Sequence, residues 1–232
     1  ATVMLKFRHI NTLTIFDWIL IIGVIAANLI YSILEESADI VGSAAGISGV
    51  ICVVMVARGN IMNYLFGVIN VSLYAYISFK AGLYGDAALN ALYYFPMQFI
   101  GWFSWVKKRE EAESVTVVAR RMSRSQRVWL SLACVILTAV VAWILHISGD
   151  PQPVKDSATT VLSVIAMFLM VRRFMEQWTL WVAVNIISIV MWSIALINGQ
   201  SHSALMVIMW VFYLANSVNG WITWVRLSKS RE

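Results

Sequence analysis

Charge is scarce in this chain of 232 residues. Asp, Glu, Lys and Arg make up 12% of it, apolar residues make up 60%, and the mean hydropathy is +0.77. Soluble domains average about 25% charged and about 45–50% apolar residues. The composition therefore excludes a soluble enzyme, a disordered tail and a nucleic-acid-binding domain. Cysteine is also scarce: Cys52 and Cys134 both lie in apolar runs, which indicates buried, reduced thiols and excludes a disulfide scaffold.

Catalytic and metal-binding motifs are missing as well. The sequence has no HExxH, no Cys/His metal spacing, no paired carboxylates, no Ser with a suitable base and no phosphate-binding glycine loop. We therefore expect no enzyme activity, no cofactor and no metal.

Long apolar runs are what the chain has instead. A membrane helix needs about 20 mostly apolar residues. Eight runs approach or meet this length, at residues 13–34, 40–57, 62–79, 87–106, 128–147, 157–171, 178–197 and 204–225. A charged loop at residues 107–127 separates the fourth run from the fifth. We therefore predict an all-α membrane protein with eight transmembrane helices.

Positive charges gather on one side of this predicted topology. With eight spans both chain ends share a side, and of the 17 Lys and Arg all except Lys80 and Lys155 fall there. This distribution predicts that both termini are cytoplasmic. The basic residues then mark topology and contact anionic lipid. Glu110, Glu111 and Glu113 interrupt the basic loop, which argues against nucleic acid as its partner.

Two parts of the chain resemble each other. Phe66 and Asn70 align with Trp181 and Asn185, and GWFSWV at residues 101–106 aligns with GWITWV at 220–225. Because each repeat has three helices, a linker helix between them keeps the repeats parallel. We expect this 3+1+3 arrangement plus an extra N-terminal helix, with substrate bound between the repeats near the membrane midplane.

The repeat gives the domain bounds that we predict. They are an extra helix at residues 1–36, a first bundle at 38–106, a basic loop with the linker helix at 107–150, a second bundle at 151–226 and a tail at 227–232.

Amides and aromatic rings recur at helical spacing on four predicted spans, whose middles carry no Asp, Glu, Lys or Arg. A single buried amide often only joins two helices, for about 0.6 kcal/mol. Matching stripes on four helices favour a ligand pocket instead. The candidate substrate-binding residues are Asn70, Asn90, Tyr94, Gln98, Trp181, Asn185, Tyr213, Asn216 and Ser217.

Aromatic and small residues near the span ends have simpler explanations. Trp105, Trp178 and Trp224 are expected in the aromatic belt at the membrane interface. Gly101 and Gly220 are expected to allow close helix packing.

The chemistry of these candidates constrains the ligand. Amides suit another amide or sugar hydroxyls, and aromatic faces attract cations by about 0.5–2 kcal/mol. No Arg or Lys is available for a phosphate. We expect a flat aromatic substrate, uncharged or diffusely cationic, with hydroxyls or an amide. Because proton coupling needs an ionisable group in the membrane, uniport is favoured, and sodium coupling is left open.

Pro96 lies inside the fourth predicted span. Proline removes a backbone hydrogen bond, so this position predicts either a hinge or a static kink. The aligned residue in the second repeat is Ala215, which makes any hinge asymmetric.

The stretches NYLFGVINVSLYAYISFKAGLYGDAALNALYYFPMQFIGWFSW, residues 63–105, and WTLWVAVNIISIVMWSIALINGQ, residues 178–200, resemble the PnuC family of bacterial nicotinamide riboside transporters. The likeness covers about residues 38–226. That family resembles the SWEET sugar transporters in its 3+1+3 architecture. The resemblance implies import of nicotinamide riboside, a form of vitamin B3, across the bacterial inner membrane by facilitated diffusion and alternating access. A cytoplasmic kinase then traps the riboside by phosphorylation.

Other functions remain as alternatives. They are a SWEET-like sugar uniporter, a transporter of another vitamin or nucleoside such as thiamine, and a structural membrane protein without a ligand. The density of amides and aromatic rings argues against the sugar uniporter. The sequence leaves open whether the chain forms a homo-oligomer.

Overall fold

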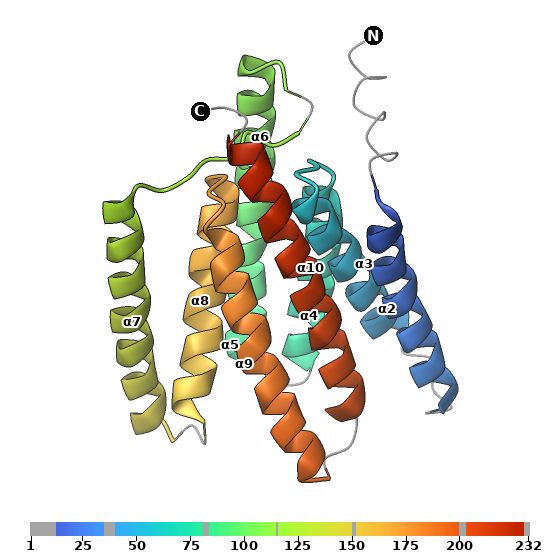
Figure 1. The fold of residues 1–232 in the computed structure, drawn as a ribbon. Coiled ribbons are helices and arrows are strands. Elements are labelled where there is room, and N and C mark those ends of the chain that lie inside the picture. The colour runs from blue at the N-terminus through green and yellow to red at the C-terminus, as the bar shows by residue number, and fades with distance from the viewer. Residues whose placement is uncertain are drawn as a thin grey trace. The chain divides into compact units, whose positions relative to one another are not determined.

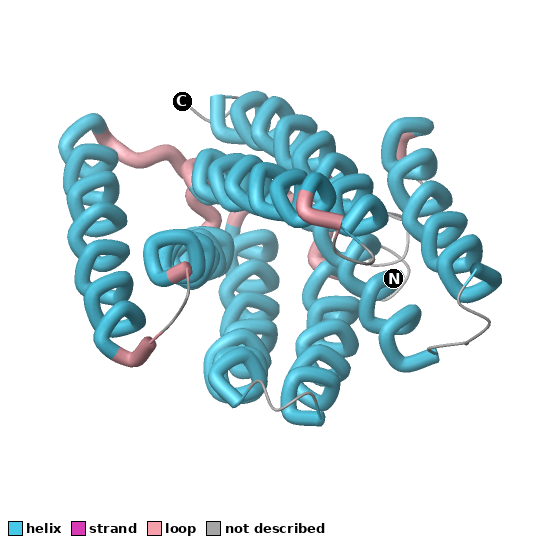
Figure 2. Tube along the Cα trace, turned by 90° about the horizontal axis from the view of Figure 1, so that it is seen from below, coloured by secondary structure: helices cyan, strands magenta, loops and turns pink. Residues whose placement is uncertain are grey.

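The computed structural model describes residues 13–34, 40–80, 84–114, 116–149, 152–199 and 203–229 (Figure 1). Their elements are α2 Ile15–Leu34, α3 Ile40–Ala57, α4 Asn63–Lys80, α5 Tyr84–Ala88, the π-helix η2 Leu89–Tyr94, α6 Phe95–Glu111, α7 Arg124–Ile147, α8 Pro153–Val171, α9 Gln177–Ile197 and α10 Ser203–Lys229. These ranges contain no strand, only an isolated bridge between Arg120 and Phe174 (Figure 2). The predicted all-α class is confirmed.

Several of these helices are long and apolar enough to cross a membrane. Five qualify among the described residues: Ile40–Ala57, Arg124–Ile147, Pro153–Val171, Gln177–Ile197 and Met206–Lys229. In α2 a shorter apolar stretch, Ile15–Tyr31, is present. Neither α4 nor α6 qualifies, since α4 carries asparagines, tyrosines and Lys80 and α6 ends in charged residues. The chain is a multi-pass membrane protein whose polar side chains concentrate on particular helices.

The chain divides into two compact units, residues 1–117 (unit 1) and 118–232 (unit 2). In unit 1, α2 packs on α3, α3 on α4, and α4 on α5, η2 and α6. In unit 2, α7 packs on α8, α8 on α9 and α9 on α10, as Figures 1 and 2 both show. Each unit therefore begins with a helix that contacts only the next one among the major packing contacts. The 3+1+3 arrangement and the domain bounds stay predictions.

The fourth predicted span is not one regular helix. It is divided into α5, the π-helix η2 and α6, and Pro96 is the second residue of α6. The Phe95 N–H donates to the Asn90 carbonyl, five residues back, as a π-helix requires. Because Pro96 has no N–H, the ladder loses a bond where the wider helix returns to α geometry. The structure shows a π-helical segment that ends two residues before Pro96, and the hinge or kink at Pro96 stays a prediction.

The loop predicted at residues 107–127 is shorter than expected at both ends. The α6 helix continues to Glu111, and α7 begins at Arg124. Ser123 and Gln126 form a capping box, in which each side chain bonds the backbone N–H of the other residue. These two bonds satisfy free N–H groups of the first turn, so α7 begins four residues before its apolar run.

Trp105, Trp178 and Trp224 are buried, with 0%, 2% and 0% of their surface exposed, so their predicted place in the interfacial belt is wrong. Trp105 meets Tyr64 in a T-shaped contact at 5.1 Å, and Trp178 meets Trp224 in the same way at 6.1 Å. Proximity to a span end misled the sequence interpretation, because each ring is covered by its own unit.

Two glycines make these aromatic contacts fit. A Cβ at Gly101 would lie 2.3 Å from Tyr64 Cε1, and one at Gly220 would lie 2.5 Å from the Trp178 ring. Both distances are too short for any side chain, so close packing at the two glycines is confirmed. The same packing in both units also supports the alignment of GWFSWV with GWITWV.

Hydrogen bonds fix how the rest of the two units correspond. After α3, the N–H groups of Arg58, Gly59 and Asn60 donate to the carbonyls of Val54, Val56 and Met55; after α8, those of Arg172, Arg173 and Phe174 donate to Phe168, Met170 and Leu169. In this register Asn63 corresponds to Gln177, and Asn70 corresponds to Val184. The sequence alignment of Asn70 with Asn185 is therefore wrong by one residue, which is about 100° around a helix.

Candidate functional site

Gln98 is the most deeply buried candidate in unit 1, with 4% of its surface exposed. It packs against Gly67 of α4, where an added Cβ would lie 2.2 Å from Oε1. Its Nε2 donates to the Tyr94 carbonyl at 3.3 Å, and its Oε1 has no hydrogen-bond partner. An unpaired buried amide oxygen costs about 1–3 kcal/mol, so Gln98 is poised to accept a bond from a ligand.

Asn90 and Tyr94 both lie on the π-helix η2. Asn90 donates from Nδ2 to the Asp86 carbonyl at 2.9 Å. The Tyr94 ring meets Tyr93 in a T-shaped contact at 5.2 Å. Single π-helical turns are frequent at functional sites, and this one carries two of the candidate side chains next to Gln98.

Asn70 serves partly as a helix-to-helix link. Its Nδ2 donates to the Ala45 carbonyl of α3 at 2.8 Å. This is the simple joining role that a single buried amide often has. Since Asn70 and Asn185 do not correspond, their equivalence no longer argues that both contact a ligand.

Unit 2 brings three candidates together. Asn185 of α9 donates from Nδ2 to the Ser217 hydroxyl of α10 at 2.8 Å, and both side chains are buried. Asn216 is buried beside Ser217 in the sequence, with 2% of its surface exposed. The bond leaves acceptor and donor capacity on the Asn185 carbonyl and the Ser217 hydroxyl.

Two aromatic candidates in unit 2 are half-buried. Trp181 lies one turn before Asn185 on α9. Tyr213 on α10 meets Trp210 in a T-shaped contact at 5.6 Å. Such rings can stack on a flat ligand.

The sequence interpretation missed Gln177, which is fully buried at the start of α9. Neither its Oε1 nor its Nε2 has a hydrogen-bond partner among the described residues. Its counterpart Asn63 is fully buried too; its Nδ2 donates to the Asn60 carbonyl at 2.7 Å, while its Oδ1 has no partner. Only the corrected register reveals that both units place a buried amide at the start of the middle helix.

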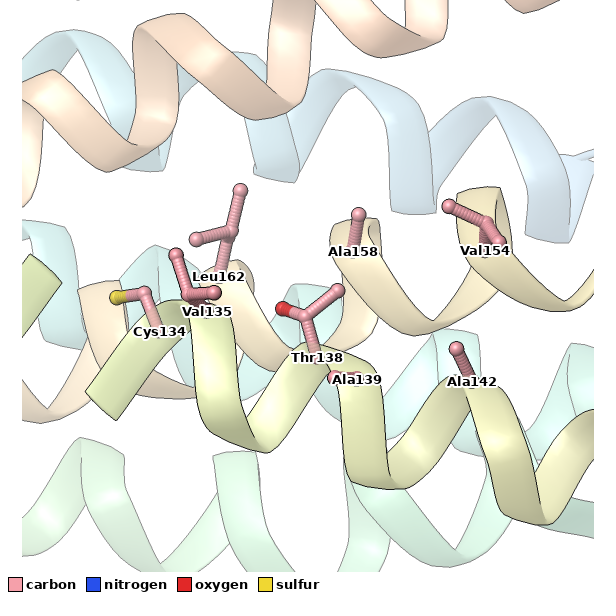
Figure 3. A pocket seen from close by; sticks show the side chains of 8 residues that line it. All are labelled: Cys134, Val135, Thr138, Ala139, Ala142, Val154, Ala158 and Leu162. Carbon is pink, nitrogen blue, oxygen red and sulfur yellow. The ribbon is translucent and has the colours of Figure 1, made fainter. Parts of the chain in front are cut away.

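A cavity of about 490 Å³ lies apart from these residues, between α7 and α8. Its lining side chains include Cys134, Thr138, Ala142, Ala158 and Leu162, which come from both helices (Figure 3). We call it the α7–α8 groove. Only Thr138 offers a hydroxyl there, so the groove does not suit a polar substrate.

Comparisons with known proteins identify the family of the chain. Residues 39–226 match the family model described as "Nicotinamide mononucleotide transporter". The chain is 43% identical over 190 residues to the nicotinamide riboside transporter PnuC of Neisseria mucosa, covering 81% of this chain and 72% of that protein. It is 32% identical over 188 residues to PnuC of Haemophilus influenzae, covering 80% and 79%.

The chain also matches a more distant relative and a solved structure. The chain is 24% identical over 166 residues to the riboflavin/roseoflavin transporter RibM of Streptomyces davaonensis, covering 70% of each chain. The solved structure is titled "Crystal structure of the Vitamin B3 transporter PnuC"; it is 37% identical, has a TM-score of 0.76, and the match covers 95% of this chain and 94% of that one. The family model spans more than half of the chain, and the solved structure has the same all-helical fold. The chain therefore belongs to the PnuC family of membrane transporters.

Proposed function

We propose that the chain imports nicotinamide riboside by uniport. The observation that carries this proposal is the buried amide set, with Gln98 and its unpartnered Oε1 in unit 1 and the Asn185–Ser217 pair in unit 2. Nicotinamide riboside offers a carboxamide, a cationic pyridinium ring and ribose hydroxyls, which are the groups that amides, hydroxyls and aromatic faces bind. Relatives that share 43% and 32% identity carry this substrate in their names.

Each candidate side chain has a role in this proposal. Gln98 and Asn90 bond the carboxamide or the ribose, and Tyr94, Trp181 and Tyr213 stack on the pyridinium. Asn185, Asn216 and Ser217 bond the ribose hydroxyls, and Asn70 contributes its free acceptor capacity. Pro96, next to η2, is the hinge about which unit 1 bends during alternating access.

The direction of transport follows from charge and chemistry. The Lys and Arg distribution places both termini in the cytoplasm, and the membrane is then the bacterial inner membrane. No group in the candidate set is ionisable near neutral pH, which favours movement down the substrate's own gradient. A cytoplasmic kinase that phosphorylates the riboside keeps the internal concentration low.

A second vitamin is the competing substrate. The likeness to the riboflavin/roseoflavin transporter favours a larger flat ring system bearing hydroxyls. The family model's description names the mononucleotide instead. We expect its phosphate to be rejected, because desolvating a phosphate without Arg or Lys is costly.

A titration of the detergent-purified protein separates these substrates. Isothermal titration with nicotinamide riboside, its mononucleotide, riboflavin and glucose is expected to give saturable heat with the riboside only. Saturable binding of the mononucleotide would contradict the phosphate argument. Binding of riboflavin or glucose without the riboside would replace the proposed substrate.

A further inference from the structure

A second cavity, of about 340 Å³, lies in unit 2 where the start of α7, the α8–α9 turn and the end of α10 meet. Three basic side chains line it, Arg121, Arg127 and Lys229, together with one acidic side chain, Glu176. We call this cavity the basic pocket. Three cations against one carboxylate make it a site for a negatively charged group.

Two hydrogen bonds hold the Arg121 side chain in place at the wall of the pocket. Its Nε donates to the Ser228 hydroxyl at 2.7 Å, and Nη2 donates to the Val225 carbonyl at 3.1 Å. Both acceptors belong to the last turns of α10. The guanidinium is therefore oriented by uncharged groups, and its positive charge is not neutralised by them.

The single carboxylate of the pocket is engaged through Oε1, while its buried Oε2 has no hydrogen-bond partner among the described residues. Glu176 Oε1 accepts from Arg127 Nε at 3.0 Å and from the Met122 N–H at 3.1 Å. Half of the Arg127 side chain is exposed, with 48% accessible, so it can still reach a ligand. Lys229 is exposed and has no ion-pair or hydrogen-bond partner among the described residues. After the Glu176 pair, the pocket retains two uncompensated cations.

The α7–α8 groove continues along the same helix face. Cys134 and Thr138 lie seven and eleven residues after Arg127, close to two and three whole turns, so all three share one face of α7. At 1.5 Å per residue, Cys134 is about 10 Å from Arg127 along the axis. The groove lining is apolar except for Thr138. A charged recess and an apolar channel thus follow one another along α7.

We propose that unit 2 binds one anionic phospholipid. Its headgroup phosphate lies in the basic pocket on Arg121, Arg127 and Lys229, and one acyl chain lies in the α7–α8 groove. Basic pockets between membrane helices suit such headgroups, and Arg presents paired N–H groups to phosphate oxygens. Trp221 lines the pocket and is 46% exposed, and tryptophan is the residue type that prefers the headgroup level of a membrane.

Unit 1 lacks the corresponding charges. In the alignment of GWFSWV with GWITWV, Glu110 of α6 takes the place of Lys229 of α10. The first turn of α2 holds the acidic Asp17, whereas the first turn of α7 holds the basic Arg124 and Arg127 and no acidic residue. The proposed site is therefore a property of unit 2.

Titration of the detergent-purified full chain with dioleoylphosphatidylglycerol, followed by native mass spectrometry, tests the proposal. The variants are Lys229→Gln in the basic pocket and Ala142→Leu in the groove. The matched control is Arg226→Gln, which removes one exposed charge from the same helix outside the pocket. Glycerol phosphate, which has the charge without the acyl chains, is the soluble probe, and dioleoylphosphatidylcholine is the neutral lipid.

We expect one saturable phosphatidylglycerol, weakened about fivefold by Lys229→Gln and unchanged by Arg226→Gln, since one basic side chain is worth about 1 kcal/mol here. Ala142→Leu weakens the lipid as well, because it fills the groove. Equal losses in Lys229→Gln and Arg226→Gln would show attraction by net charge only and overturn the proposal. Equal occupancy by phosphatidylcholine, or full competition by glycerol phosphate, would overturn it too.

Discussion

In unit 1 the last helix is interrupted by η2 and Pro96, whereas in unit 2 α10 runs from Ser203 to Lys229 without a break. Yet both units place an aromatic ring on a glycine, and both bond the turn before the middle helix in the same pattern. At that turn Gly59 and Arg173 share a positive φ of 64°, although only glycine adopts it without strain. We call these common features, the aromatic–glycine contacts and the matching turn, the shared frame. The two units differ in the polar side chains that this frame holds.

Under the proposed function, this difference between the units suits an asymmetric ligand. A riboside has a carboxamide at one end and a sugar at the other, so two identical half-sites would fit it poorly. In the proposed function, unit 1 contributes Gln98 beside a π-helix, and unit 2 contributes the Asn185–Ser217 pair. The frame is set by packing, which tolerates little change, and the polar groups vary within it.

The shared frame should fail first when its glycines are filled. Gly101→Ala and Gly220→Ala are each expected to lower the free energy of unfolding by about 3 kcal/mol, because the new Cβ would overlap a buried aromatic ring. Thermal unfolding in detergent measures this. Gly46→Ala is the control, since its Cβ would meet Asn28 at an ordinary 3.6 Å. Equal melting temperatures for all three variants would refute the shared frame.

The divergent amides should affect binding and leave the fold intact. Gln98→Ala and Asn185→Ala are each expected to weaken riboside binding by about tenfold to a hundredfold, because a ligand group loses its partner in a buried site. Isothermal titration gives the affinities. Ser131→Ala on exposed α7 is the matched control. If Gln98→Ala and Asn185→Ala both bind the riboside with unchanged affinity, these two side chains are not part of the binding site.

The ion pairs of the two units both bury the carboxylate and differ in the exposure of the arginine, which is 16% for the Arg58 side chain and 48% for the Arg127 side chain. Asp17 is fully buried and accepts from Arg58 at 2.6 and 2.9 Å, whereas Arg127, which pairs with Glu176, is half-exposed. Asp17→Asn should therefore cost about 2 kcal/mol of stability. Arg127→Gln should cost less, because Glu176 keeps the hydrogen bond from the Met122 N–H. Chemical unfolding measures both, and a larger loss in Arg127→Gln would reverse the comparison.

Pro96→Ala tests whether the break in unit 1 moves. The variant restores a backbone donor, so we expect a severalfold slower uptake rate with little change in riboside affinity or stability. Vesicle uptake and titration separate the two quantities. If neither rate nor affinity changes, Pro96 is a static kink.

Much of this fold could be predicted from the sequence. The bilayer requires apolar helices and confines charged residues to the loops, and both patterns can be read from the order of residues. The register could not, since the matching Asn70 and Asn185 outweighed the turn geometry that sets it. The π-helix was hidden because its residues are as apolar as those of a regular helix. Gln177 was missed because it follows the charged turn after α8, where a polar side chain usually faces water.

The candidate site was predicted as a set of residue types and only partly as an arrangement. Gln98 and the Asn185–Ser217 pair emerge as buried polar groups, whereas Asn70 and Asn90 bond backbone carbonyls. Sequence spacing gives the face of a helix. Which neighbouring helix that face contacts depends on how aromatic rings pack on glycines, and residue spacing does not predict that packing.

Uptake of labelled nicotinamide riboside into proteoliposomes tests the central claim, that the candidate site is uncharged and moves its ligand down a gradient. At zero membrane potential we expect the internal concentration to rise only to the external one, and imposed proton or sodium gradients to leave it there, because the riboside itself is a cation that a potential would drive. We also expect Gln98→Ala to slow uptake at least tenfold when the riboside is well below saturation, in line with its weaker binding. Accumulation of the riboside above the external concentration, driven by a proton or sodium gradient, would contradict uniport.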